Sequence, residues 1–160
     1  ITLKNIIFIC MRYLLGLVYF FLCHVYGHQF EKNNVIIKQP IIKVNKNSTK
    51  VGAGYFKILN NSQKRIYLLG VESKISDKQE VHEVIEDNNV FKMRPITKGL
   101  LIEPRTSIEF KPQSYHIMFF NFNKALESNQ MIEAKLNFDD DFFIPIKFKV
   151  IINHGKHNHH

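Results

Sequence analysis

Two histidines and two methionines are the side chains of this sequence whose types and spacing best suit a metal ion. They are His82, Met93, His116 and Met118, called the His/Met set below. Thioether sulfur is a good ligand for copper(I) and a poor one for hard ions, while imidazole suits copper in either oxidation state. Neutral ligands also hold copper less tightly than thiolates do. The set therefore predicts a copper(I) site that can release its metal.

The spacing groups these side chains in pairs. One residue separates His116 from Met118 in a run of strand-forming residues, so both side chains share one face of a strand. His82 precedes the turn residues Asp87-Asn88-Asn89 and Met93 follows them, so a hairpin would bring these two towards each other. The two pairs are expected to meet at one end of the domain. The alternative is that each Met fills the core and each His is an ordinary strand residue.

The elements that must position the set are strands. Short β-rich runs alternate with polar turns such as Ser76-Asp77, and no stretch from Val35 onward keeps a helical period. About nine such runs predict an all-β, two-sheet sandwich with Greek-key connections. A helical turn in Leu126–Lys135 would make the fold mixed α+β. The expected strands are Val35–Val44, Val51–Leu59, Arg65–Ser73, Glu80–Glu86, Val90–Met93, Thr106–Phe110, Tyr115–Asn121, Met131–Phe138 and Phe142–Ile152.

The N-terminal segment, residues 1–27, is predicted to be a signal peptide. An apolar run, Tyr13–Tyr26, follows Arg12 and ends at Gly27, as secretory signals do. The rival interpretation joins the run to Ile6–Ile9 as one membrane anchor, which would place Arg12 inside the span at a cost. In either case the domain, residues 28–152, is expected outside the cytoplasm, in the periplasm. An anchor would hold it close to the membrane.

Both cysteines, Cys10 and Cys23, lie in that segment, so the domain itself has no thiol for a disulfide, a zinc site or a nucleophile. Leu22 is not the small residue that lipid attachment at Cys23 normally needs. No Ser/His/Asp or Cys/His set is available for hydrolysis, so we expect a binding protein rather than an enzyme.

The net charge of +8 raises the question of nucleic acid, because basic surfaces release counterions from phosphates. The Lys and Arg residues are scattered, however, and none of them cluster with exposed aromatic residues. We therefore expect no nucleic-acid binding.

The His/Met set resembles the signature of the periplasmic PCu(A)C copper chaperones. Ten residues separate His82 from Met93 and twenty-two separate Met93 from His116, as in that family. The resemblance covers about residues 35–150. Similar residues also surround the set, namely Val81-His82-Glu83, Met93-Arg94-Pro95, Lys111-Pro112, Tyr115-His116-Ile117-Met118, Gly52-Ala53-Gly54-Tyr55-Phe56 and Asn60.

The resemblance implies a cupredoxin-like β-sandwich that binds Cu(I) through the His/Met set. It also implies delivery of copper toward the Cu(A) centre of cytochrome c oxidase, directly or through a thiol-bearing copper-transfer protein. We expect the chain to act as a monomer. Two departures stand out. Gln113-Ser114 replaces a usual glycine, which puts that turn's backbone in doubt. Glu83 stands where some members have Met, and should face away from the site.

The C-terminal tail, residues 153–160, is polar and rich in imidazole, which is typical of a disordered metal-binding segment. Its His154, His157, His159 and His160 are expected to form a second, looser copper(II) site. His28, near a new N-terminus, is a further candidate copper ligand. The alternatives to delivery are an exported sandwich for copper storage or tolerance, and an interaction module without a specific metal.

Overall fold

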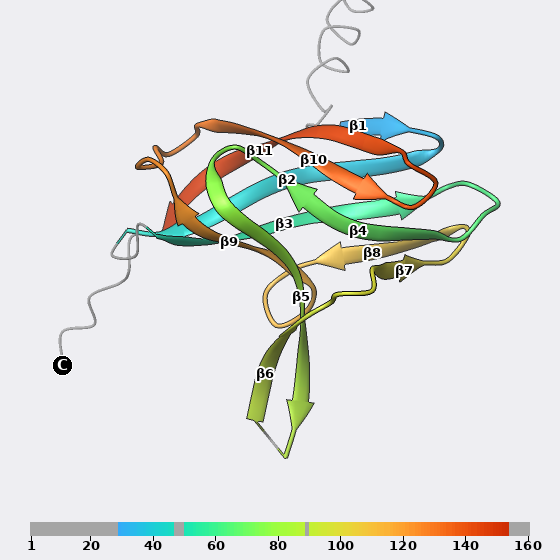
Figure 1. Cartoon of the computed structure of the whole chain (residues 1–160), viewed down its shortest axis with the longest axis horizontal. Coiled ribbons are helices and arrows are strands. Elements are labelled where there is room, and N and C mark those ends of the chain that lie inside the picture. Colours follow the sequence, from blue (N-terminus) through green and yellow to red (C-terminus); the bar gives the residue numbers. More distant parts are fainter. Residues whose placement is uncertain (1–28, 47–49, 89, 154–160) are drawn as a thin grey trace, which may run out of the picture.

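The computed structural model describes residues 29–46, 50–88 and 90–153, and every regular element in these ranges is a β-strand (Figure 1). The strands are β1 (Gln29–Lys32), β2 (Val35–Asn45), β3 (Val51–Asn60), β4 (Ile66–Glu72), β5 (Ser76–Asp87), β6 (Val90–Pro95), β7 (Leu100–Ile102), β8 (Thr106–Phe110), β9 (His116–Phe122), β10 (Met131–Phe138) and β11 (Phe143–Asn153). All the strands expected from the sequence are present, and β1 and β7 are additional. These ranges contain no helix of the length and apolar character needed to cross a membrane.

The alternative of a helical turn is excluded, and one expected break between strands is wrong. Leu126–Lys135 forms no helical turn, since it leads through a turn into β10 at Met131. Ser76-Asp77 is the start of β5 rather than a break, because Ser76 pairs with Phe122 at the far end of β9. The side-chain amide of Gln79 also donates to the Ser76 carbonyl at 2.8 Å, which holds this end of the strand.

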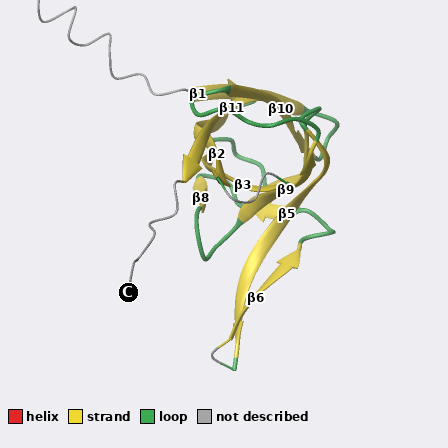
Figure 2. Ribbon diagram, turned by 90° about the vertical axis from the view of Figure 1, so that its left-hand side faces the viewer, coloured by secondary structure: helices red, strands yellow, loops and turns green. Residues whose placement is uncertain are grey.

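The strands form one hydrogen-bonded sheet in the order β6-β5-β9-β3-β2-β11-β10-β4-β7, with β1 paired to β2 and β8 to β3. Only the β11–β2 pairing is parallel among the ladders of the described residues. The sheet curls around the core, with β1, β11 and β10 on one side and β3, β9 and β5 on the other (Figure 2). The predicted all-β sandwich is confirmed, and its two layers are joined by a continuous ladder.

The apolar core of the described residues lies entirely between Val35 and Val150. It follows from strand alternation: every second residue of β11 from Ile144 to Val150 is buried, while the residues between them are exposed. In β9, Ile117 and Phe119 point inward and are fully buried. The alternate residues His116, Met118 and Phe120 therefore lie on the outer face.

Two glycines of β3 allow β9 to pack closely. A Cβ on Gly54 would lie 2.9 Å from the Phe119 ring, and one on Gly52 would lie 2.8 Å from the Phe122 ring. Real Cβ atoms essentially never approach this closely. Gly54 needs to be glycine because Phe119 and Ile117 are fully buried, whereas a Cβ on Gly52 would require the Phe122 ring to move. The Gly-x-Gly pattern of β3 thus sets the position of the strand that carries His116 and Met118.

The β5–β6 hairpin extends away from the sandwich (Figures 1 and 2). The first part of β5 pairs with β9, and the part from His82 onward pairs with β6. All six residues of β6 are exposed. The hairpin is therefore held to the molecule mainly through β5.

Candidate metal centre

The strand register places the whole His/Met set on one face of β6-β5-β9. His82 lies where two ladders meet, opposite His116 on β9 and opposite Pro95 on β6. Met118 lies opposite Glu80, two residues before His82, and Met93 lies opposite Val84, two residues after it. Opposite residues and alternate residues share a face of a sheet. His82 is therefore the diagonal neighbour of both methionines.

The fold places His82, His116 and Met118 on two adjacent strands, whereas Met93 lies farther from Met118, on the edge strand β6. The two histidines are buried, and their ring centroids are 5.6 Å apart. Met118 is partly buried, whereas Met93 is 63% exposed. In a flat sheet the Cα atoms of Met93 and Met118 would be about 16 Å apart, two strands across and four residues along.

His116 is prepared to bind through its Nε2 atom. Its Nδ1 lies 3.0 Å from the Ser114 carbonyl oxygen, which can only accept, so Nδ1 carries the proton and Nε2 has the lone pair. Burial lowers the pKa of His116, and the nearby His82 lowers it further, while the Ser114 hydrogen bond opposes this. The ring is therefore neutral at neutral pH, as metal binding requires.

The turn that supplies the Ser114 carbonyl is closed by backbone hydrogen bonds between Lys111 and residues 114 and 115. Gln113 adopts a φ of +62°, a left-handed conformation that favours glycine. Gln113 therefore takes the conformation that a glycine would adopt with less strain.

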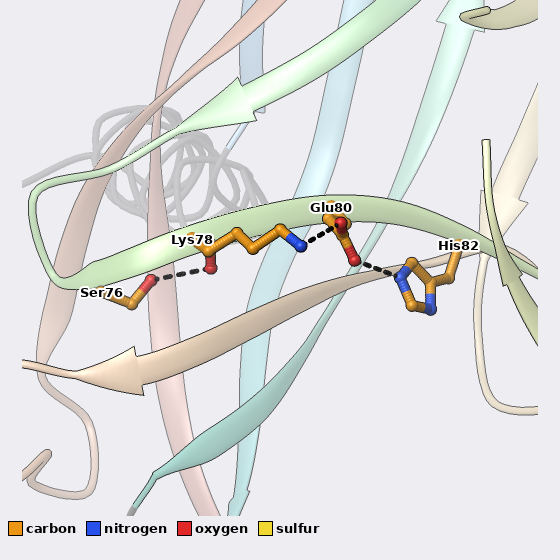
Figure 3. Close-up of polar contacts among 4 residues, drawn as sticks. All are labelled: Ser76, Lys78, Glu80 and His82. Carbon is orange, nitrogen blue, oxygen red and sulfur yellow. Dashed lines mark hydrogen bonds and ion pairs between the residues drawn. The ribbon is translucent and has the colours of Figure 1, made fainter. Parts of the chain in front are cut away.

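His82 is held differently, through its Nε2 atom (Figure 3). This atom lies 2.9 Å from Oε2 of Glu80, whose other carboxylate oxygen is 2.6 Å from Nζ of Lys78. The hydrogen bond from Lys78, followed by that from His82, lowers the pKa of Glu80, so the carboxylate is ionised at neutral pH. The prediction from sequence missed Glu80. Its signal was available, because Glu80 precedes His82 by two residues and must share its face.

The Nδ1 atom of His82 is buried and has no hydrogen-bond partner within the described residues. An unsatisfied buried polar atom costs about 1–3 kcal/mol. A metal ion bound at Nδ1 would remove this cost. The described residues hold no group of three or more His, Cys, Asp or Glu side chains arranged for a metal. A site at His82 and His116 would therefore draw its further ligands from the thioethers, which suits a soft cation.

Aromatic and charged groups border the two imidazoles. The Phe120 ring centroid is 6.2 Å from that of His82, and Nζ of Lys78 lies 5.8 Å from the Phe120 centroid. Glu83 pairs with Arg94 on the other face of the hairpin, as expected. The predicted signal segment, His28 and the tail histidines lie outside the described residues.

The sequence profile of the LpqE-like lipoproteins matches residues 35–150. The uncharacterized protein RP573 of Rickettsia prowazekii (strain Madrid E) is 30% identical over 89 residues, which cover 56% of this chain and 49% of that protein. The chain thus spans about half the length of this curated relative.

Solved structures share the fold. The apo PCuAC domain from PmoF1 superposes with a TM-score of 0.66 at 17% identity, covering 79% of this chain and 100% of that one. The copper-bound PCuAC domain from PmoF2 gives 0.65 at 15% identity, covering 79% and 99%. The Cu(I) form of DR1885 from Deinococcus radiodurans gives 0.58 at 18% identity, covering 72% and 77%. At these identities the likeness establishes a PCuAC-type, cupredoxin-like β-sandwich.

Proposed function

This chain belongs to the LpqE-like (PCuAC) family, and we propose that it is an exported copper(I) carrier that binds one Cu(I) through the His/Met set. The observation that carries the proposal is the pair of buried imidazoles opposite each other in register, one with an unpartnered Nδ1. The copper-bound PmoF2 domain and Cu(I)-DR1885, which share its fold, support it.

The ligand chemistry explains why Cu(I) is the cargo. Imidazole nitrogens that carry a lone pair bind copper, and the thioethers favour its soft, reduced form over zinc or calcium. None of these groups is a thiol, so binding does not depend on forming a thiolate. The protein holds copper without turning over a substrate.

Release follows from the exposure of the hairpin. An incoming thiolate from an acceptor can replace Met93, which is exposed, before it reaches the buried histidines. Phe91 lies on the same face of β6 and is 60% exposed, which offers an apolar contact for that acceptor. The proposed acceptor is the Cu(A) subunit of cytochrome c oxidase or a thiol-bearing copper-transfer protein, and the proposed compartment is the periplasm. His154, His157, His159 and His160 of the tail provide a looser copper(II) site.

An anaerobic Cu(I) titration of residues 29–153 against a competing chelator tests the proposal. We expect one tightly bound Cu(I). Met118→Ala should lower the affinity at least about 100-fold, since even loss of an outer partner of a ligand costs 10–100-fold. Met131→Ala is the matched control, because Met131 is also a partly exposed strand methionine but lies on β10. Absence of Cu(I) binding, or equal affinities in the two variants, would contradict the proposal.

A further inference from the structure

The two imidazoles of the site are held by opposite ring nitrogens. His116 is held at Nδ1 by the Ser114 carbonyl, and His82 is held at Nε2 by the Glu80 carboxylate. Both partners are acceptors, so in each neutral ring the held nitrogen carries the proton and the other carries the lone pair. The lone pairs are consequently on Nε2 of His116 and on Nδ1 of His82.

We propose that Glu80 is a positioning residue for copper: it fixes His82 as the Nε2–H tautomer and so directs Nδ1 to the metal. The inference rests on the proposed function and deepens it. It assigns a role to a carboxylate that would not itself ligate the soft Cu(I) ion. It also assigns the coordinating atom of each histidine, which ligand spacing alone leaves open.

The environment of Glu80 supports a positioning role rather than an incidental surface contact. Its side chain is 26% exposed, that of His82 is 11% exposed, and their contact is 2.9 Å. Nζ of Lys78 holds the second carboxylate oxygen at 2.6 Å, so the carboxylate is restrained from both sides along one face of β5 (Figure 3). The nitrogen left without a partner is the one that the proposal assigns to copper.

The alternating spacing of β5 produces this chain of contacts. Lys78, Glu80 and His82 are alternate residues of one strand, so a single register sets all three on the outer face. Met118 lies opposite Glu80 and His116 lies opposite His82. The positioning carboxylate and three of the ligands, His82, His116 and Met118, are therefore fixed by the same β5–β9 ladder.

Glu80→Gln tests the inference in the full chain. Glutamine keeps the shape of the side chain, but its amide can either accept from Nε2 or donate to it, so the obligate acceptor is lost. We expect two-bond proton–nitrogen spectra of the copper-free wild type to show His82 protonated at Nε2 and His116 protonated at Nδ1. His82→Gln assigns the resonances. In Glu80→Gln, His82 should lose its single tautomer, and the Cu(I) affinity should fall about 10- to 100-fold.

Glu83→Gln is the matched control, because Glu83 is next to His82 in sequence but pairs with Arg94 on the other face. It should leave the tautomer and the affinity unchanged. The wild-type spectrum needs no variant, so a folding defect in Glu80→Gln does not remove the test. A proton on Nδ1 of His82 in the wild type, or equal Cu(I) affinity in Glu80→Gln and Glu83→Gln, overturns the inference and leaves the proposed function standing. A wild-type chain that binds no Cu(I) overturns both.

Discussion

The members of the His/Met set differ in how firmly the fold holds them. His82 and His116 are buried and each has a hydrogen-bond acceptor at one ring nitrogen. Met118 is partly buried and lies on β9, which is paired with a strand on each side. Met93 is exposed and belongs to the edge strand. Copper should therefore be bound by three well-placed ligands, with Met93 as the ligand that closes and opens the site.

This difference predicts a graded response to loss of the two thioethers. Met93→Ala should lower Cu(I) affinity about 10-fold, less than Met118→Ala, and most of the loss should be faster release, because the remaining ligands keep their positions. Stopped-flow transfer of Cu(I) to a chelator measures the release rate. Val90→Ala, an exposed substitution on the same hairpin but on its other face, is the control. Slower release from Met93→Ala, or a larger affinity loss than in Met118→Ala, would refute the assignment.

For single residues, the sequence predicts which side chains are ligands better than it predicts which groups hydrogen-bond to those ligands. The one-residue spacing of His116 and Met118 predicts that they share a strand face. The strand register confirms this, because the two residues pair with alternate residues of β5. The role of Glu80 depends on which ring nitrogen of His82 it contacts, and a spacing pattern carries no information about that. The spacing pattern likewise cannot show that Nδ1 of His82 is buried without a hydrogen-bond partner, because this depends on the packing of the folded chain.

Among the elements, β3 determines where β9 lies. Gly54 faces the core beneath Ala53, which pairs with Met118, and any Cβ at Gly54 would meet Phe119 and Ile117 of β9. The packing of this pair of strands thus supports the outer face on which the ligands lie. The position of β9, which carries His116 and Met118, therefore depends on the contact of Gly54 with Phe119 and Ile117 on the core side of the sheet.

Gly54→Ala should therefore destabilise the fold by about 1–3 kcal/mol, as overpacking of a core does. It should also weaken Cu(I) binding, since β9 must shift to accommodate the methyl group. Gly70→Ala in β4 is the matched control, because a Cβ there meets nothing within 4 Å. Thermal unfolding of the two copper-free variants measures the difference. Equal melting temperatures would show that close packing of β3 against β9 does not determine the stability of the fold.

Alternation predicts the long strands well and the short or polar ones poorly. In β11 the alternation from Ile144 to Val150 matches the observed burial at each position. β1 contains one apolar residue, Phe30, and is too polar to show a period, whereas β7 is apolar but has only three residues. The start of β5 has turn-forming residues, and pairing with Phe122 overrides their preference.

On the scale of the whole molecule, three adjacent strands carry lysines and no acidic residue. β2, β3 and β11 contain no Asp or Glu, but each carries at least one lysine. The register connects this surface to the site, because Met118 pairs with Ala53, and Ala53 pairs with Lys43, all on one face. The lysines of these strands therefore lie beside the ligand-bearing outer face of β9.

An acceptor with an acidic docking face should be steered to the site by these lysines. Steering raises association rates by 10–10³-fold at low salt, and screening removes it as the Debye length shortens. Transfer of Cu(I) to such an acceptor should slow at least about 10-fold between roughly 10 mM and 500 mM salt. Replacement of Lys43 and Lys149 by Gln should reduce that dependence, whereas replacement of Lys64 and Lys98 should not. Transfer to a small neutral chelator controls for effects on the site itself, and a protein acceptor with a salt-independent rate would rule out electrostatic steering.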